Sequence, residues 1–552
     1  MTLLLRALLK NFNSRANILG EFSQGIVDKY LISSVAQKFP KSKMMDIQGI
    51  LWEDEIMRHK MVNQRTNSFK SYTNLPDTLE RATEQVDLKL KRVNNTIFEF
   101  DKYYSMSKPR QIHFQLGNLI TSLNQSSIYY PIENDDGIFQ LMNLDTSAYP
   151  EDDYYYDDDD DDDDDFDMDE LHASSNEGLI YHSNSDINSN YNTDTSSRRS
   201  GTNNGNSMNA PTTQPQSPAI SSPFYQTSVV LEMSPNFRVS TLTSNKTYIC
   251  SGSVDGSLST YVPSTGMHQE YQLTYEENGI TNFILPSKTS YFNDQLIVAS
   301  NDNKIRHYDV TKRSVSKTTS FDYAINCMCE NPQNANLVMM VGDSTRWMIV
   351  DKRSPGDFGN GVVGLYGTHL DYGFACDWNS DGVVLASGNQ DGLLKLYDFR
   401  KLDQELITLS GCNHGAIRNL KFNSFCDKLC FAESIDNVYI VDLKKLFQKS
   451  CFGSNDTTVT LGDESHSSWY DDGYDEDLFS SDSVEDCYQN INFFGKVAGL
   501  DFQLDDDEFG EVLNIGISDS SVGGILRYRF DAFQHSVIDH EGIYETIDTD
   551  WV

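Results

Sequence analysis

Three side chains of this sequence have the types that a nucleophilic enzyme uses. His369, Ser387 and Asp391 could act as base, nucleophile and orienting acid in an acyl-transfer site. The same types can also form a buried hydrogen-bonded network, because a buried imidazole or carboxylate without a partner costs several kcal/mol. Ser387 lies inside a short apolar run, and Asp391 lies in the Asp-Gly turn that follows it. These positions favour the structural network over catalysis.

The elements that must position these side chains are two short strands with a tight turn between them. Residues 368–398 predict an apolar strand, an Asp-Gly turn, and a second apolar strand that ends at Tyr397. His369 precedes Asp391 by 22 residues. This order resembles a WD repeat, which is one four-stranded blade of a β-propeller. The resemblance implies that the turn aspartate, the loop histidine, Ser387 and the strand aromatic bond to one another.

A second, less complete set stands one repeat further along the chain. His414 also precedes Asp436 by 22 residues, but Ala432 occupies the place of the serine and Val441 lies near the place of the aromatic residue. By the resemblance, we expect a full network in the blade of Asp391, and the blade of His414 and Asp436 is the candidate for a second one.

The turn pattern recurs at a period that suits four-stranded blades. Similar turns stand at Asp255, Asp302, Asp391 and Asp436, with a weaker one at Ser344, at steps of about 42 to 47 residues. Two degenerate units, at 118–130 and 512–528, bring the number of candidate blades to seven. The sequence therefore predicts an all-β fold, a seven-bladed WD-repeat β-propeller. We expect an early and a late strand of the chain to complete its last blade, because this pairing removes free sheet edges.

The composition argues against several classes of function. The 552 residues include 43 Lys and Arg but 82 Asp and Glu, and a formal charge of −39 disfavours nucleic acid and anionic lipid as partners. The nine cysteines contain no Cys-x-x-Cys pair, which favours buried thiols over zinc or disulfides. We find no Gly-rich phosphate loop, no nucleophile elbow and no apolar run long enough to span a membrane. We therefore expect no catalysis and no cofactor.

The remaining segments are extensions and insertions. Residues 151–170 carry 15 acids, including nine consecutive aspartates at 157–165, and repulsion at that charge density predicts disorder. The basic and apolar N-terminus fits either an organelle transit peptide or a helix docked on the propeller, and we expect a cytoplasmic or nuclear protein. The predicted organisation is an N-terminal helical extension at 1–44, a strap at 45–110, propeller strands at 111–146 and 227–535, disordered acidic and Ser/Asn-rich residues at 147–226, an acidic loop at 450–490 and a C-terminal tail at 536–552.

The order of three motifs gives a narrower resemblance. Residues 45–53, 111–120 and 414–443 resemble a family of fungal WD-repeat proteins that carries a short domain of unknown function. Some members of this broader group resemble a substrate receptor of the GID ubiquitin ligase. The resemblance implies that the propeller captures a substrate protein and that another segment docks on the ligase core. The tail that ends in Trp551 is a candidate for that docking segment.

The resulting hypothesis is a non-catalytic scaffold or adaptor that binds proteins, with a ubiquitin-ligase substrate receptor as its specific form. The alternative is an acidic, chaperone-like or chromatin-associated scaffold that binds basic proteins through residues 157–165. We expect partner contacts at exposed arginines of the repeats, namely Arg306, Arg346 and Arg418, and at Trp551.

Overall fold

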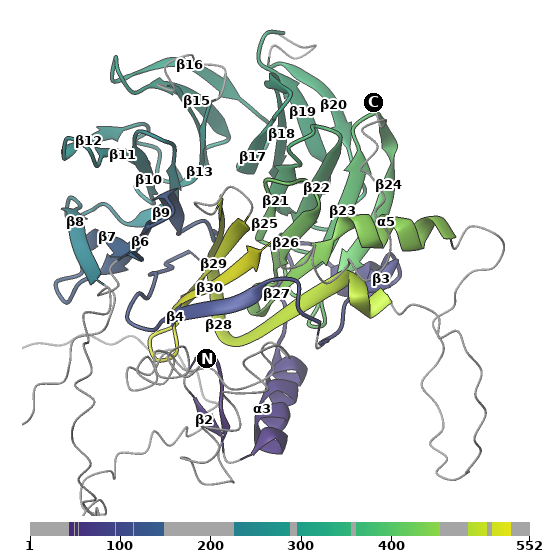
Figure 1. Cartoon of the computed structure of the whole chain (residues 1–552). Helices are drawn as coiled ribbons and strands as arrows, with labels where there is room; N and C mark the ends of the chain where they lie inside the picture. The colour runs from purple at the N-terminus through teal and green to yellow at the C-terminus, as the bar shows by residue number, and fades with distance from the viewer. Residues whose placement is uncertain are drawn as a thin grey trace, which may run out of the picture. The chain divides into compact units, whose positions relative to one another are not determined.

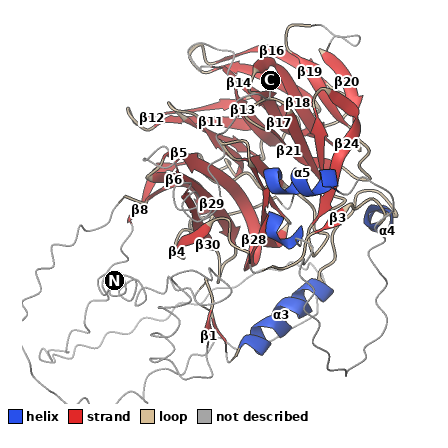
Figure 2. Cartoon of the chain, turned by 45° about the vertical axis from the view of Figure 1, so that its right-hand side comes forward, coloured by secondary structure: helices blue, strands red, loops and turns tan. Residues whose placement is uncertain are grey.

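The computed structural model of the chain consists mainly of antiparallel strands, with few helices (Figures 1 and 2). It describes residues 44–48, 50–52, 54–93, 95–113, 115–147, 226–287, 295–354, 360–452, 484–504 and 510–531. The expected N-terminal extension, most of the two long insertions and the tail with Trp551 lie outside these residues. No helix in the described part of the chain is long and apolar enough to cross a membrane.

Six sheets of four or more strands make up the described part of the fold. The first contains β5 (Thr121–Asn124), β6 (Ser127–Glu133), β7 (Phe139–Asp145) and β8 (Gln226–Glu232). The second contains β9 (Val239–Ser244), β10 (Ile249–Ser253), β11 (Ser257–Val262) and β12 (Met267–Gln272). The third contains β13 (Thr281–Pro286), β14 (Gln295–Ser300), β15 (Lys304–Asp309) and β16 (Ser314–Ser320).

The next two sheets follow the same antiparallel order. One contains β17 (Ile325–Asn331), β18 (Asn334–Gly342), β19 (Trp347–Asp351) and β20 (Val362–Tyr366). The other contains β21 (Gly373–Trp378), β22 (Val384–Asn389), β23 (Leu393–Asp398), β24 (Lys401–Ser410) and, parallel to β24, the short strand β3 (Leu88–Lys89).

The last sheet has seven strands and joins the two ends of the fold. It contains β25 (Asn419–Phe422), β26 (Lys428–Ala432), β27 (Ile435–Asp442), β28 (Tyr488–Leu504), β29 (Gly510–Ser518), β30 (Gly524–Asp531) and β4 (Glu99–Tyr104). The first half of β28 pairs with β27 and the second half pairs with β29, with Lys496 at the division. The early strand β4 pairs antiparallel with the late strand β30, as the sequence predicts.

Successive sheets contact one another through their first strands. Strand β5 contacts β9, β9 contacts β13, and the contacts continue strand by strand through β17, β21, β25 and β28. Strand β28 in turn contacts β5. Buried side chains join neighbouring sheets in the same order, for example Leu394 of β23 with Phe431 of β26, and Tyr104 of β4 with Ile128 of β6. Because both faces of most sheets are covered in this way, strands such as β22 and β26 are almost entirely buried.

Residues 44–98, which we call the strap, lie against this set of sheets. The strap contains the paired strands β1 (Met44–Met45) and β2 (Leu51–Trp52), the helices α3 (Glu55–Ser68) and α4 (Thr78–Thr83), and β3. Helix α3 begins after Asp54, whose carboxylate accepts a hydrogen bond from the N–H of Met57 and so caps the first turn. Its Arg58 and Val62 are buried, so the helix docks through a partly charged face.

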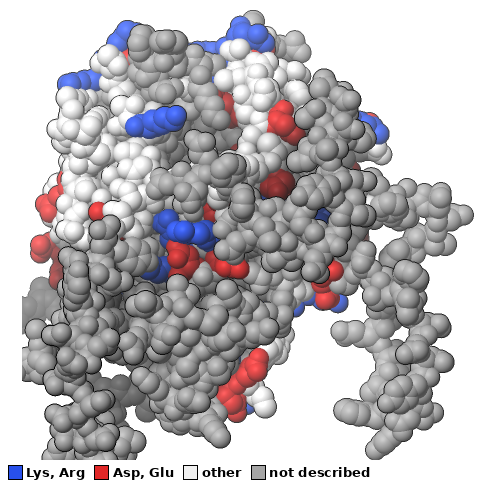
Figure 3. Space-filling model, viewed as in Figure 1, with Lys and Arg blue, Asp and Glu red and all other residues white. Residues whose placement is uncertain are grey.

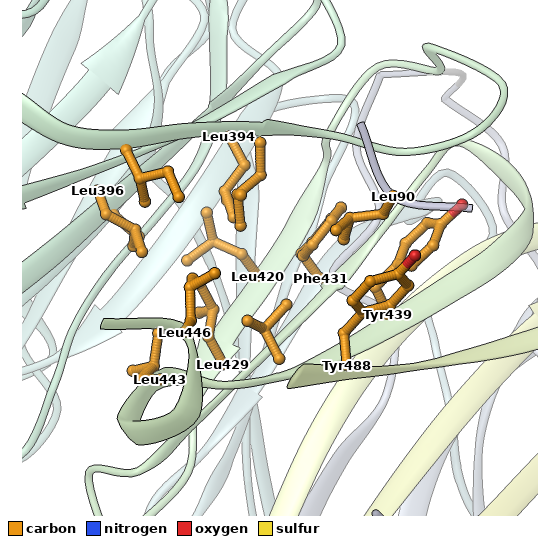
Figure 4. Close-up of a cluster of buried hydrophobic side chains, with 14 of the residues drawn as sticks. Leu90, Leu394, Leu396, Leu420, Leu429, Phe431, Tyr439, Leu443, Leu446 and Tyr488 are labelled. Atoms are coloured by element: carbon orange, nitrogen blue, oxygen red, sulfur yellow. The ribbon is translucent and has the colours of Figure 1, made fainter. Parts of the chain in front are cut away.

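The strap also contributes to the core of the last two sheets. Leu90 is fully buried in a cluster with Leu394, Phe431, Tyr439 and Tyr488 (Figure 4). Two further helical segments, α5 (Leu443–Phe452) and the 3-10 turn η2 (Val484–Cys487), lie between β27 and β28.

Two boundaries differ from the sequence prediction. Strand β4 falls inside the expected strap at 45–110, yet it belongs to the last sheet because β30 would otherwise have a free edge. The degenerate unit at 118–130 corresponds to the β5–β6 hairpin, which joins the first and second strands of its sheet. The turn equivalent to that of Asp391 is instead Asn134–Gly137, between the second and third strands.

Candidate functional site

Each sheet has one end at which its second and third strands are joined, and we call this the turn end. Asp255, Asp302, Ser344, Asp391 and Asp436 all lie in or beside such turns, between β10 and β11, β14 and β15, β18 and β19, β22 and β23, and β26 and β27. The antiparallel order brings the connections between successive sheets to the same end. The turn end therefore gathers the residues that the sequence pattern singles out.

The Asp391 carboxylate lies at the centre of a buried hydrogen-bonded network. His369 Nδ1 is 3.1 Å from Asp391 Oδ2, and His369 Nε2 is 2.7 Å from Ser387 Oγ. The N–H groups of Leu370 and Leu393 donate to the same carboxylate at 2.8 and 3.0 Å. The three residues that could form a nucleophilic triad are thus brought together, and each is almost or completely buried.

Burial decides what this arrangement can do chemically. Ser387 has no exposed surface, so a substrate carbonyl cannot reach its hydroxyl. Tyr397 packs against Trp347 with ring centroids 5.1 Å apart, and burial raises the pKa of Tyr397 well above its usual range. Gly392 completes the turn with φ +76, where an added Cβ would lie 2.7 Å from the carbonyl oxygen of His414. The network therefore holds the turn and its neighbours together.

Asp436 has a different partner from the one that the repeat spacing predicts. Its two carboxylate oxygens accept hydrogen bonds from Arg65 Nε and Nη2 of helix α3, each at 2.7 Å. His414 has φ +47, and burial lowers its pKa to about 4. The predicted His414–Asp436 pair is therefore wrong, because the strap brings a bidentate guanidinium to this carboxylate.

Glu433 holds the loop of His414 in place and was not identified from the sequence. Its Oε1 accepts hydrogen bonds from the N–H groups of Asn413 and Gly415, both at 3.0 Å, and its Oε2 accepts one from Asn437 Nδ2 at 2.9 Å. Burial raises the pKa of Glu433 to about 7, although these hydrogen bonds lower it in part. The sequence pattern did not single out Glu433, which directly precedes Ser434 of the turn, because the repeat pattern has no glutamate at that position.

This carboxyl group predicts a pH dependence of stability. Its folded pKa of about 7 lies above the ordinary 4.5, so the folded state holds one more proton between these values. The stabilisation is fully present below pH 4.5 and is lost as the pH rises through 7, with a slope of up to about 1.4 kcal/mol per pH unit. Urea unfolding from pH 4.5 to 7.5 should show this slope as the difference between the wild type and Glu433→Gln. Parallel curves for the two proteins would contradict it.

The first strap anchor is built around Asp46. Asp46 Oδ1 accepts hydrogen bonds from the N–H groups of Gln48 and Ile50, and Oδ2 accepts one from Trp52 Nε1 at 2.9 Å. Burial raises the pKa of Asp46. The Gln48 amide in turn donates to the carbonyl of Phe494 at 2.9 Å and accepts from its N–H. This cluster fixes the start of the strap to the turn end of the seven-stranded sheet.

The second anchor lies beside the His369 network. Asp371 accepts hydrogen bonds from the N–H and the side-chain amide of Asn74 at 2.8 and 3.0 Å. Gln390 Nε2 donates to the carbonyl of Tyr72. The strap thus covers the turns of Asp391 and Asp436. Among the described residues, it makes no hydrogen bond to the turns of Asp255, Asp302 and Ser344.

A cavity of about 230 Å³ lies between the first strands of the sheets. Its wall includes amide side chains such as Asn282, Asn326 and Asn419, which bond across from one sheet to the next. Two charged residues of its wall form ion pairs: Glu330 pairs with Lys352 at 2.6 Å, and Lys421 lies 3.6 Å from Asp501. The cavity can receive a polar side chain, and its described wall carries no nucleophile–base pair.

The predicted partner-binding arginines occupy three different environments. Arg346 is exposed at the turn end. Arg418 lies at the wall of the central cavity, and burial lowers its pKa to about 10. The expectation that Arg306 is exposed is wrong, because its guanidinium is buried against Asp302 and Ser300. Trp551 lies outside the described residues.

The cysteines of the described strands are free thiols, several of them fully buried. Within the same residues, no group of three or more His, Cys, Asp or Glu side chains is placed to hold a metal ion.

Comparison with known proteins identifies one repeat. The family model described as "WD domain, G-beta repeat" matches residues 367–398, which contain His369, Ser387, Asp391 and Tyr397. No curated protein matches the chain. A chain in the crystal structure of the mitotic checkpoint complex aligns with 52% of this chain and 77% of its own length, at 15% identity and a TM-score of 0.35. At this score the alignment carries no argument, so the WD40 repeat rests on the sequence match and on the network at Asp391.

Proposed function

We propose that the chain is a non-catalytic WD-repeat scaffold that binds a partner protein at the part of the turn end that the strap leaves open. This proposal is based on one observation: the strap covers some turns of the turn end and leaves the others uncovered. The strap is anchored at Asp371, Asp391's neighbour Gln390, and Asp436. The connections of the other sheets carry exposed side chains, including Arg346 and Tyr275, which is 91% exposed.

The fold proposed for this scaffold is a closed, seven-bladed propeller. It is supported by the cycle of contacts among β5, β9, β13, β17, β21, β25 and β28, and by the two different pairings of β28. If Lys496 divides the seven-stranded sheet, each half has four strands, and each of the other five sheets supplies one blade. A rigid ring of this kind offers its loops as a binding platform.

Among the described residues, the candidate Ser-His-Asp set is buried, which supports binding rather than chemistry. The His369 network is buried, and two charged residues of the central cavity, Glu330 and Lys421, form ion pairs with Lys352 and Asp501. We use the term open sector for the part of the turn end that the strap leaves uncovered. We infer that a partner lies across the open sector near Arg346 and places a side chain at the mouth of the central cavity near Arg418. Exposed aromatic and arginine side chains are enriched at protein interfaces.

The binding surface can be tested with three arginine variants of the tagged full chain. We expect Arg346→Ala and Arg418→Ala to lower the yield of at least one co-purified protein by fivefold or more. Arg400→Ala is the matched control, because Arg400 is also exposed but pairs with Asp398 away from the turn end. Quantitative mass spectrometry after chemical crosslinking measures the yields, and equal thermal melting shows that the variants fold.

The same capture distinguishes the two forms of the hypothesis. The sequence resemblance supports a substrate receptor, for which ubiquitin-ligase subunits and a second, arginine-dependent set of proteins should be captured at moderate salt. For the alternative, a scaffold for basic proteins, capture should disappear at moderate salt and after deletion of residues 157–165, whatever residue stands at 346 or 418. Capture that none of these changes affects would contradict both forms.

The charges of the described surface do not favour the alternative by themselves. Figure 3 shows both signs on the same face, with Lys and Arg side chains mainly along its upper edge and Asp and Glu elsewhere. The aspartate run at 157–165 lies outside the described residues. We also propose that the chain acts in the cytoplasm or nucleus, which is consistent with its many free thiols.

A further inference from the structure

The outer strand β24 has an edge that is only partly paired. It contains ten residues, but β3 pairs only with Leu409 and Ser410 at its end. Residues 403–406, in the preceding part of the strand, are exposed; Glu405 is in register with Tyr397 of β23, and residues 402–404 and 406 lie at irregularities of this pairing. A strand edge of this kind presents backbone N–H and C=O groups to any extended chain that reaches it.

The docking of β3 shows which geometry this edge accepts. The N–H of Asp87 donates to the carbonyl of Thr408 at 3.0 Å, and the N–H of Leu90 donates to the carbonyl of Ser410 at 2.8 Å. The Asp87 carboxylate accepts a hydrogen bond from the N–H of Thr408 at 2.7 Å. The edge therefore binds an extended segment that runs parallel to β24, and it does so through the carbonyl groups of alternate β24 residues, Thr408 and Ser410.

A groove continues from this point along the unpaired edge. Its volume is about 690 Å³, and it is lined by Gln85 and Asp87 of the strap, by Thr368, and by residues 404–408 of β24. Leu406 is 48% exposed there, which leaves an apolar contact for an incoming side chain. The groove thus combines a free strand edge with a wall, as strand-adding peptide sites do.

The charge of the groove selects the partner. The two charged residues in its lining, Asp87 and Glu405, are both acidic, and Asp403 is exposed beside them. Lys395 lies beneath and is 3.3 Å from Glu405, and Lys401 binds Gln404 at 2.9 Å. The pKa of Glu405 lies below its usual value. Burial raises this pKa, but a backbone hydrogen bond and the nearby Lys395 together lower it by more, so the carboxyl group is ionised at neutral pH.

We propose that the unpaired edge of β24 binds an extended, lysine- or arginine-bearing strand of a partner protein. The strand adds to the sheet in line with β3, places its cationic side chains beside Asp87, Asp403 and Glu405, and places an apolar side chain on Leu406. This surface lies on the outer strand of a sheet, away from the open sector of the turn end. It therefore works independently of Arg346 and Arg418.

The test uses the full chain and a fluorescein-labelled, acetylated decapeptide in which lysine alternates with valine. Fluorescence anisotropy at physiological salt should show binding, and hydrogen exchange should show slower exchange at residues 404–407. A decapeptide of alternating glutamate and valine should not bind. A peptide with five lysines followed by five valines should bind at least tenfold more weakly, because it cannot present one charged face to the groove.

Two charge reversals locate the site. Glu405→Lys and Asp403→Lys should each weaken the alternating peptide at least fivefold. Asp136→Lys makes the same change in net charge at an exposed turn of another sheet and should have no effect. Equal weakening by Asp136→Lys, or protection that does not include residues 404–407, would show attraction to the acidic chain as a whole and would overturn the proposal. Arg346→Ala should leave the peptide affinity unchanged.

Discussion

Replacement of Asp391 by alanine is expected to lower the free energy of unfolding by about 3–5 kcal/mol. The substitution removes the acceptor of His369 Nδ1 and of the N–H groups of Leu370 and Leu393. All of these donors would remain buried without a partner, and an unsatisfied buried group costs more than a hydrogen bond contributes. Urea unfolding followed by circular dichroism measures the change.

The control for this prediction is Asp398→Ala in the same sheet. Asp398 pairs with Arg400, whose side chain is 74% exposed, and exposed ion pairs contribute little. His369→Ala and Ser387→Ala should fall between the two, because each removes one member of the network and leaves the carboxylate bonded to the backbone. A change at Asp391 no larger than that at Asp398 would show that the network does not support the fold.

Phe98→Ala is expected to cost a similar amount, about 3–5 kcal/mol, because it removes a fully buried ring at the junction of the early and late chain. The Phe98 ring centroid is 5.2 Å from that of Phe530 and 5.9 Å from that of Phe502. The backbone of Phe98 is held on both sides by the Gln489 side chain. Without the ring, β4 loses its hold on β30, and the late strands gain a free edge.

Two measurements separate this effect from a general loss of apolar contact. Phe425→Ala removes the same side chain at a position that is 41% exposed and should change stability much less. Hydrogen exchange of Phe98→Ala should quicken first at residues 99–104 and 524–531, which form the β4–β30 pair. Uniform acceleration across all sheets would argue that this junction has no special role in closing the fold.

The strap joins several parts of the fold and covers part of the turn end. It leads directly into β4, which completes the last sheet, it adds a strand to β24 through β3, and it anchors α3 to Asp436 through Arg65. In the proposed function, the strap sets which loops a partner contacts, because it covers the turns of Asp391 and Asp436 and leaves others uncovered. The ends of β7 and β8 that follow and precede the first long insertion, and those of β27 and β28 around the second, lie at the end of the sheets opposite the turns.

The sequence by itself determined the strands and the turns that join them. The Asp391 turn, its histidine 22 residues earlier and the apolar runs on either side are local patterns, and the structure brings His369, Ser387 and Asp391 together as that pattern requires. The pairing of an early with a late strand also followed from the sequence, because an unpaired edge is unfavourable wherever it occurs.

Only the tertiary structure decided which partners the remaining polar groups have. Arg65 and Asp436 are separated by 371 residues, and no periodicity relates them, so the local spacing wrongly favoured His414. Glu433 likewise binds the N–H groups of Asn413 and Gly415, about 20 residues earlier in the chain, whereas the buried Arg306 pairs with Asp302 of its own hairpin. Short-range patterning fixes where a strand or turn forms, whereas the pairing of buried charges depends on contacts distant in the chain, which one sequence does not encode locally.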